Sequence, residues 1–170
     1  MQVLDISNWM INDEYQLSGT RKKHWVVNPM DEKEFIFKIP RVNGELWAEI
    51  VAFKIGEALG LKMSNYNIAL RNGQLGVLST NFVNKDVETF YEGGDLFEAK
   101  FPSFNRYRLH NYTLENIVDI LKEFYLDEEF VAIPFFDALI GNQDRHCDNW
   151  GLIIKGNRSF LAPIYDNGTS

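Results

Sequence analysis

The chain has 170 residues, of which 45% are hydrophobic and 24% are charged, and this balance is typical of one globular domain or of two small lobes. Its formal net charge of −7 argues against direct DNA or RNA binding, which depends mainly on neutralising phosphates, whereas ATP needs only a few local cations and Mg²⁺. The chain has no apolar run of about 18 residues that would span a membrane, no signal-peptide pattern at its start and a single cysteine, Cys147, so we expect a cytoplasmic protein without a disulfide framework.

The first half of the chain is expected to consist of strands and one helix. Four strands are expected, at residues 24–29, 34–40, 67–71 and 74–79. The last two are joined by the Asn-Gly dipeptide at 72–73, which is typical of a tight hairpin. A helix is expected from Glu45 to Gly60, because Leu46, Ile50 and Phe53 recur at helical spacing.

The second half changes character and is expected to be mainly helical. Residues 84–111 hold a Gly-Gly pair, a proline and several aromatic residues, which predict a long ordered loop or inserted segment. Thr113 is expected to cap a helix, and a second helix is expected from Asp127 to Leu139, with Pro134 kinking it or marking its start. A strand hairpin is expected over residues 150–164.

The order of these elements predicts an α+β protein with two lobes. The first lobe, residues 1–83, would combine an antiparallel sheet with one helix. Residues 113–170 would form a partial, helical second lobe, and residues 84–112 would be an inserted loop or hinge region between the two.

The densest group of polar residues lies between an expected helix and an expected strand, at residues 141–149. Asp144 and Asn149 are five positions apart, which is the separation of the base and the metal-binding asparagine in a kinase catalytic loop. Asp166 follows the expected hairpin and stands two residues before Gly168, where kinases carry their second metal ligand, although the phenylalanine of that motif is missing. The pattern predicts phosphoryl transfer, with Asp144 as the base and Asn149 and Asp166 as Mg²⁺ ligands.

The same loop also allows simpler interpretations. Asp144 and Asn149 could cap neighbouring backbone in an ordinary turn, but the spacing and the returning carboxylate would then have to coincide by chance. His146 has no second histidine at zinc-site spacing, and Cys147 has no base partner in the sequence. His146 is expected to have a packing or loop-bracing role, and Cys147 is expected to be a bystander to the chemistry.

Lys38 lies inside an apolar expected strand, where an inward-facing lysine needs a partner. In kinases a strand lysine contacts the α- and β-phosphates of ATP, and a helix glutamate holds its amine. Glu49 on the next expected helix is the first candidate for that glutamate and Glu45 is the second. The alternative is an alternating strand with Lys38 on its exposed face, and the downstream loop favours the functional interpretation.

A short basic stretch, residues 18–23, is the candidate phosphate-binding loop. Backbone amides around Gly19 and Thr20 would cradle phosphates, with Lys22 or Lys23 adding positive charge. The stretch has one glycine and matches neither a Gly-x-Gly-x-x-Gly loop nor a Walker A motif. An exposed basic turn is an equal alternative.

The whole chain resembles the bacterial HipA-type serine/threonine protein kinases, in particular their kinase core. The resemblance rests on residues 18–25, 35–38, 48–60, 141–151 and 163–170, and above all on the patterns Gly-Asn-x-Asp-Arg-His-x-x-Asn-Trp-Gly and Ala-Pro-x-Tyr-Asp-Asn-Gly-x-Ser. It implies a protein-kinase-like fold that uses ATP and Mg²⁺ to phosphorylate serine or threonine hydroxyls of proteins. Carried over by position, Asp144 would be the base, Asn149 and Asp166 the metal ligands, and Lys38 the contact to the ATP phosphates.

The resemblance also implies partners and further chemistry. Many members are toxins of toxin–antitoxin pairs, so an antitoxin is an expected partner, and Ser18 or Thr20 would be the local hydroxyls for autophosphorylation. Family members continue past the Asp-x-Gly motif into further helices, so a chain that stops at Ser170 is expected to be a fragment or to be completed by a separate chain. Two alternatives stay open: a nucleotide-binding partner subunit that transfers no phosphate, and a related kinase that acts on a lipid or another small hydroxyl compound.

Overall fold

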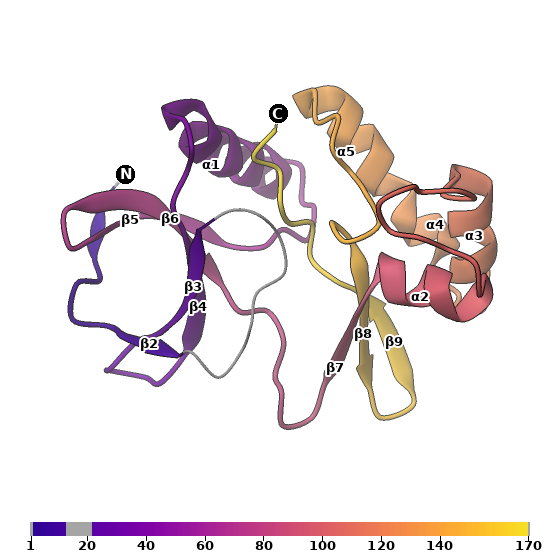
Figure 1. Cartoon of the computed structure of the whole chain (residues 1–170), viewed down its shortest axis with the longest axis horizontal. Helices are drawn as coiled ribbons and strands as arrows, with labels where there is room; N and C mark the ends of the chain where they lie inside the picture. Colours follow the sequence, from indigo (N-terminus) through magenta and orange to yellow (C-terminus); the bar gives the residue numbers. More distant parts are fainter. Residues whose placement is uncertain (1, 13–21, 170) are drawn as a thin grey trace. The chain divides into compact units, whose positions relative to one another are not determined.

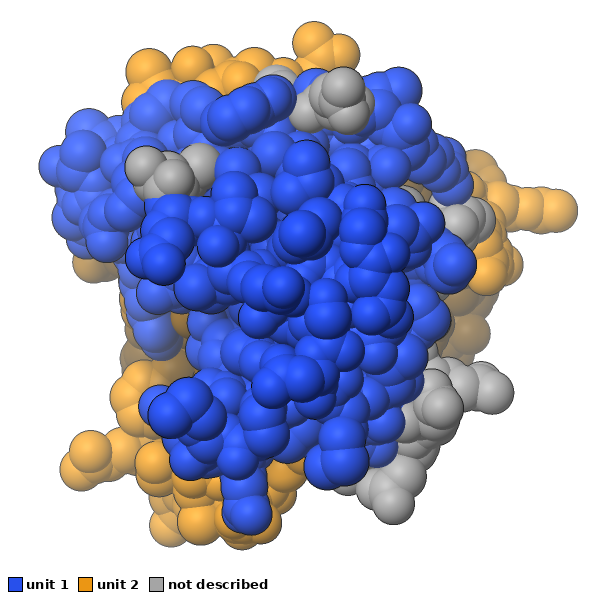
Figure 2. Space-filling view, turned by 90° about the vertical axis from the view of Figure 1, so that its left-hand side faces the viewer, with its two compact units in different colours: residues 1–81, 167–170 blue, residues 82–166 orange. Residues whose placement is uncertain are grey.

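The protein is described by a computed structural model that covers residues 2–12 and 22–169. By its internal contacts the chain divides into two compact units, which are coloured separately in Figure 2. Unit 1 comprises Met1–Asn81 and Asn167–Ser170, and unit 2 comprises Phe82–Asp166. The functional division into residues 1–83, 84–112 and 113–170 stays a prediction.

Unit 1 is built on a six-stranded sheet with the strand order β1-β5-β6-β4-β3-β2, which curls in Figure 1. Its strands are β1 (Leu4–Asp5), β2 (Met10–Asn12), β3 (Lys23–Val27), β4 (Glu34–Lys38), β5 (Tyr66–Arg71) and β6 (Gln74–Thr80). Strand β1 pairs with β5 in parallel, and every other neighbouring pair is antiparallel. The four strands expected from sequence are confirmed as β3 to β6, with the predicted hairpin between β5 and β6. The short strands β1 and β2 were not predicted.

Helix α1 (Asn43–Ala58) confirms the expected helix and packs on one face of this sheet. A buried apolar cluster joins helix and sheet, and its members are Leu46, Ile50, Phe53, Tyr66, Ile68 and Val77. A second cluster contains Ile6, Val26, Phe37, Ala69 and Leu78. Because successive strand residues point to opposite faces, Phe37 belongs to the second cluster while Lys38 faces the side of the sheet that α1 covers.

Unit 2 combines a three-stranded antiparallel sheet, ordered β7-β8-β9, with four helices (Figure 1). Its elements are β7 (Thr89–Glu92), α2 (Gly93–Lys100), α3 (Leu114–Lys122), α4 (Asp127–Phe130), α5 (Ala132–Ile140), β8 (Gly151–Lys155) and β9 (Arg158–Leu161). Thr113 caps α3 as predicted, because its hydroxyl accepts the N–H of Asn116 at 3.2 Å. Pro134 lies in the first turn of α5, where its missing N–H costs no helical hydrogen bond. Across the described residues, no helix is both long and apolar enough to cross a membrane.

The expectation of an irregular segment at residues 84–111 is wrong for its central part, which forms β7 and α2. The Gly93-Gly94 pair suggested a loop, but these residues begin α2, and a capping box between Glu92 and Asp95 starts the helix. Gly93 is needed for close packing, since a Cβ there would lie 2.3 Å from the ring of Trp150. The partner of β7 is β8, far along the chain, and local sequence carries no signal for such a pairing.

Candidate functional site

The loop after α5 carries Asp144 and is held mainly through its backbone. Gly141 ends the helix in the left-handed conformation, with φ of 72°, so that the N–H of Asn142 reaches the carbonyl oxygen of Asp137 at 2.9 Å. The side chain of Asn142 then accepts the N–H of Asp144 at 3.2 Å, and the carbonyl of Asp144 accepts the N–H of His146 at 2.9 Å. The carboxylate of Asp144 is exposed and has no hydrogen bond or ion pair with any described residue.

Asn149 lies at the other end of the same loop and is buried. Its Nδ2 donates to the carbonyl oxygen of Asp144 at 2.6 Å, which leaves Oδ1 as the amide atom suited to a cation. Asp148, the second carboxylate of the loop, is bound to Arg106 at 2.9 Å. Of the two loop carboxylates, Asp144 is therefore the one left exposed for chemistry.

Asp166 follows the β8–β9 hairpin and has an unusual backbone conformation. Its φ of 57° lies in the left-handed region, which few residues other than glycine adopt. The preceding residue, Tyr165, is bound twice to the loop: its hydroxyl donates to the carbonyl of Asp148 at 2.8 Å, and its carbonyl accepts from Arg145 at 2.6 Å. The backbone that leads into Asp166 is thus fixed to the loop that carries Asp144.

The oxygen atoms of Asn149 and Asp166 suit magnesium, which proteins usually bind through one or two hard oxygen ligands together with substrate phosphates. His146, Cys147 and Asp148 also place possible ligand atoms within 4.8 Å of one another. However, the Nδ1 of His146 accepts the N–H of Asp148 at 3.2 Å. Burial raises the pKa of the Cys147 thiol to about 12, so the thiol is protonated at neutral pH and is a poor nucleophile or ligand.

Unit 1 holds the lysine and the glutamate that were predicted to act together. The Nζ of Lys38 lies 3.5 Å from Oε1 of Glu49, and their side chains are only 14% and 3% exposed. The other carboxylate oxygen of Glu49 accepts the N–H of Asn167 at 2.9 Å. The second candidate, Glu45, accepts the backbone N–H of Arg41 at 3.0 Å. Lys38 therefore lies on a covered face of the sheet, beside the first-choice glutamate.

The candidate phosphate-binding loop is described only at its end. Ser18, Gly19 and Thr20 lie outside the described residues, whereas Lys23 begins β3. Lys23 stands directly opposite Lys38 in the β3–β4 ladder. Residues paired in this way point to the same face of a sheet, so the two lysines share the face that α1 covers.

Sequence reasoning missed several residues that support these groups. Asp137 is the one charged residue of the apolar helix α5, and a lone carboxylate in an apolar helix is a sequence signal for a buried ion pair. Its partner is Arg145, at 2.7 Å. Tyr112 receives a hydrogen bond from Trp150 at 2.8 Å and donates one to the carbonyl of Arg145 at 3.2 Å. Asn167 carries no comparable signal, because its contact with Glu49 depends on the fold.

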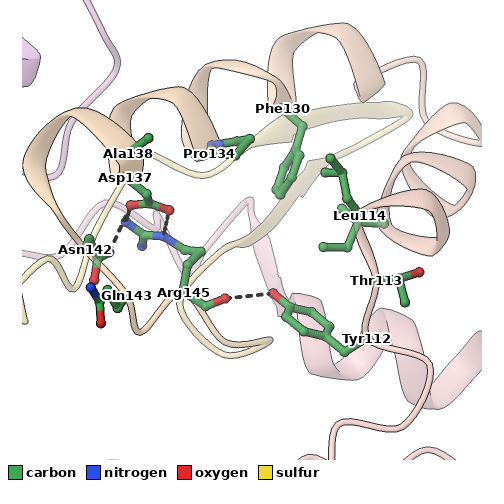
Figure 3. Close-up of a pocket in the computed structure, with 11 residues that line it drawn as sticks. Tyr112, Thr113, Leu114, Phe130, Pro134, Asp137, Ala138, Asn142, Gln143 and Arg145 are labelled. Atoms are coloured by element: carbon green, nitrogen blue, oxygen red, sulfur yellow. Dashed lines mark hydrogen bonds and ion pairs between the residues drawn. The ribbon is translucent and has the colours of Figure 1, made fainter.

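An open pocket of about 410 Å³ adjoins the loop within unit 2 (Figure 3). The ion pair of Asp137 and Arg145 lies at one end of it, and the hydroxyl of Tyr112 points toward the carbonyl of Arg145 from the other side. Its apolar wall is formed by Leu114, Ile117, Phe130, Pro134 and Ala138.

Comparison with known proteins identifies the family. A sequence model of the HipA-like C-terminal domain matches residues 15–170. The chain belongs to this HipA-like family. Among solved structures, it is similar to the proinflammatory kinase CtkA of Helicobacter pylori, with 20% identity and a TM-score of 0.81 over 99% of this chain and 61% of that one. It is also similar to HipA of Shewanella oneidensis MR-1, solved as a toxin–antitoxin complex with HipB and operator DNA, with 14% identity and a TM-score of 0.70 over 90% of this chain and 43% of that one.

These matches confirm the HipA-type recognition and the kinase-like α+β fold predicted from the sequence. At such identities the two solved structures speak for the fold alone. The HipA-like chain spans less than two thirds of the length of either one. No curated protein matches the chain in sequence.

Proposed function

We propose that this HipA-like chain carries an ATP- and Mg²⁺-dependent site that transfers phosphate to serine or threonine hydroxyls of proteins. The observation that carries the proposal is the loop of unit 2. There the backbone is braced at several points, the carboxylate of Asp144 is left exposed, and the amide of Asn149 is oriented five positions later. A loop built only as a turn would not need a buried, oriented amide next to an exposed carboxylate. Membership of the HipA-like family supports the same chemistry.

In the proposed reaction, Asp144 orients the acceptor hydroxyl and accepts its proton as the hydroxyl oxygen bonds to the γ-phosphorus and the bond to the leaving ADP oxygen breaks. Asn149 and Asp166 would hold Mg²⁺, which neutralises charge on the phosphate oxygens. The left-handed backbone of Asp166 supports this role, because conformations of this kind cost about 1–3 kcal/mol and concentrate at functional sites.

Unit 1 would supply the contacts to the nucleotide. Lys38, with its amine beside Glu49, would bind the α- and β-phosphates, as the strand lysine of kinases does. Lys23 stands directly opposite Lys38 on the same sheet face and would add positive charge toward the phosphates. The backbone amides of Gly19 and Thr20 would complete the phosphate-binding loop.

The partner is proposed by analogy with a similar structure, and the cellular compartment is proposed from the sequence. HipA of Shewanella oneidensis is described with HipB and operator DNA, and we propose a comparable antitoxin, or a complementary chain, as a partner of this protein. Direct nucleic-acid binding by this acidic chain is not proposed. The reducing cytoplasm is the proposed compartment, on the basis of the single cysteine.

Calorimetric titration of ATP into the chain, with and without Mg²⁺, tests the proposal. Asp166→Ala should weaken Mg-ATP binding by about 10-fold or more while leaving Mg-free binding little changed, because it removes a metal ligand. Lys38→Met should weaken binding under both conditions. Lys54→Met is the matched control, since Lys54 lies on the exposed side of α1, where it pairs with Glu57 at 2.8 Å.

The outcomes separate the candidate functions. Equal ATP binding by the wild type and all three variants would contradict the assigned site. Mg-dependent binding without transfer of radiolabelled phosphate to any protein would favour the nucleotide-binding partner subunit. Transfer to a lipid or a small hydroxyl compound, but not to protein, would favour the related small-substrate kinase.

A further inference from the structure

The guanidinium of Arg145 donates hydrogen bonds to three separate parts of unit 2. Its Nε and Nη2 donate to the two carboxylate oxygens of Asp137 at 2.9 and 2.7 Å, so the pair is bidentate. Its Nη1 donates to the carbonyl oxygen of Asn149 at 2.8 Å and to that of Tyr165 at 2.6 Å. One planar group therefore connects the end of α5, the end of the loop and the segment after β9.

These contacts lie next to all three proposed catalytic residues. Asp144 directly precedes Arg145 in the chain, and Asn149 supplies one of the bound carbonyls itself. The other bound carbonyl belongs to Tyr165, which directly precedes Asp166. A shift of this guanidinium would move the backbone at each of the three positions.

The anchor of the arrangement is rigid and buried. Asp137 is part of helix α5, and its carboxylate also accepts a hydrogen bond from Nδ2 of Asn142 at 2.9 Å, as Figure 3 shows. The side chains of Arg145 and Asp137 are only 10% and 8% exposed. A buried ion pair gains little net stability over well-packed apolar residues of similar volume, so this pair is better explained by the geometry that it imposes on the loop.

We propose that Arg145, held by Asp137, is the positioning residue that sets the proposed base and both proposed metal ligands relative to one another. The inference rests on the proposed phosphoryl-transfer site. Arg145 acts through backbone carbonyls and is not itself a catalytic residue. Its fork-shaped donor set is essential to the role, because a lysine in its place would keep the charge opposite Asp137 but would present a single nitrogen to the three acceptors.

The kinetic test uses Arg145→Lys and Asp137→Asn in the full chain. A displacement of the order of 1 Å costs about 100-fold in rate, so kcat should fall by about 10- to 100-fold in both variants. The Mg²⁺ concentration for half-maximal activity should rise about 10-fold, as expected when the support of a metal ligand is lost. The KM for ATP at saturating Mg²⁺ should stay within about two-fold of the wild type. A loss of folding alone would lower kcat without raising the Mg²⁺ concentration for half-maximal activity.

Leu121→Ala is the control for general destabilisation. Leu121 is fully buried in α3 of the same unit and belongs to none of the elements that Arg145 joins. Its truncation should lower the stability of unit 2 while leaving the Mg²⁺ requirement of the folded protein unchanged. A shift of that requirement in Leu121→Ala as large as in Arg145→Lys would overturn the proposal.

A second measurement does not depend on activity. Amide hydrogen exchange of the metal-free protein should speed up in Arg145→Lys by about 10-fold or more at residues 142–151 and 164–168 together, and in Leu121→Ala mainly at α3. If the wild type transfers no phosphate, the proposed function fails, whereas the exchange pattern still decides the positioning role. If the amides of both segments exchange in Arg145→Lys at the rates of the wild type, the positioning role is refuted. Asp137→Asn, which keeps the shape of the side chain, serves both measurements if Arg145→Lys does not fold.

Discussion

Two arginines of unit 2 form ion pairs in opposite ways. Arg106 is 24% exposed and gathers four carboxylates around one guanidinium, those of Glu92, Asp95, Glu98 and Asp148. Arg145 is 10% exposed and binds one carboxylate and two backbone carbonyls. The same functional group thus neutralises negative side chains in one region and fixes the course of the backbone in the other.

The number of charge contacts of an arginine therefore does not indicate which groups it holds in place. Hydrogen bonds that Arg106 donates to carboxylates, that of Glu98 first, raise the pKa of Arg106, but water competes for much of this network. Arg145 pairs with the carboxylate of Asp137, and its Nη1 donates to two main-chain carbonyls, which cannot turn away as side chains can. Mutations in the two regions should therefore differ in size and in kind.

The largest effect is expected at Arg145. Arg145→Met should lower the free energy of unfolding of unit 2 by about 3–5 kcal/mol, because it leaves the carboxylate of Asp137 buried without its partner. Hydrogen exchange of the slowest amides of unit 2 would measure the loss. A loss below about 1 kcal/mol would mean that water reaches the carboxylate of Asp137 in the variant and that the ion pair does not anchor the loop.

The next effect is on the reactivity of Cys147. This residue lies in the loop between Arg145 and Asp148, and Asp148 is one of the carboxylates that pair with Arg106. Burial is the main cause that raises the pKa of its thiol to about 12, and the charge of Asp148 adds to it. Because the thiolate is the reactive form, alkylation of the folded protein at neutral pH should be at least about 100-fold slower than in urea. Mass spectrometry of iodoacetamide-treated samples would give both rates, and rates within 10-fold of each other would show that the loop opens readily.

A smaller effect is expected at Arg106. Arg106→Met should cost about 1–2 kcal/mol of unfolding free energy, since its pairs are partly exposed but act as a network. The difference from the wild type should shrink in 1 M salt, where such charges are screened. Denaturant titration at low and high salt would test this, and a cost equal to that of Arg145→Met would remove the distinction between the two regions.

The smallest effect is a pH dependence at Glu92. Burial, followed by the charge of Asp148, raises the pKa of Glu92 in the folded protein above its ordinary value of 4.5. A raised carboxyl pKa favours folding below the ordinary value, and this contribution is lost as the pH rises through the folded value. The stability of the wild type relative to Glu92→Gln should therefore fall between acidic and neutral pH, by less than about 1 kcal/mol. Thermal unfolding of both proteins from pH 4 to pH 7 would check the sign.

Much of this architecture could be predicted from short-range signals. Periodicity predicted α1 and the strands β3 to β6, and the spacing of Asp144 and Asn149 predicted the loop. The missed features depend on residues that are distant in sequence. Strand β7 is recognisable only from its pairing with β8, and the contact between Asn167 and Glu49 joins positions 118 residues apart. The pair of Asp137 and Arg145 lies between these cases, because a lone carboxylate in an apolar helix is visible while its partner is not.

Phosphate transfer from radiolabelled ATP, measured for the wild type and Asp144→Asn with ATP binding followed on the same samples, tests the central claim most directly. Asp144→Asn keeps the shape of the side chain but loses the base, so transfer should fall by about 100- to 10,000-fold while ATP binding stays within about two-fold. Equal transfer by both proteins would contradict the assignment of Asp144, and with it the proposed phosphoryl-transfer site of this loop.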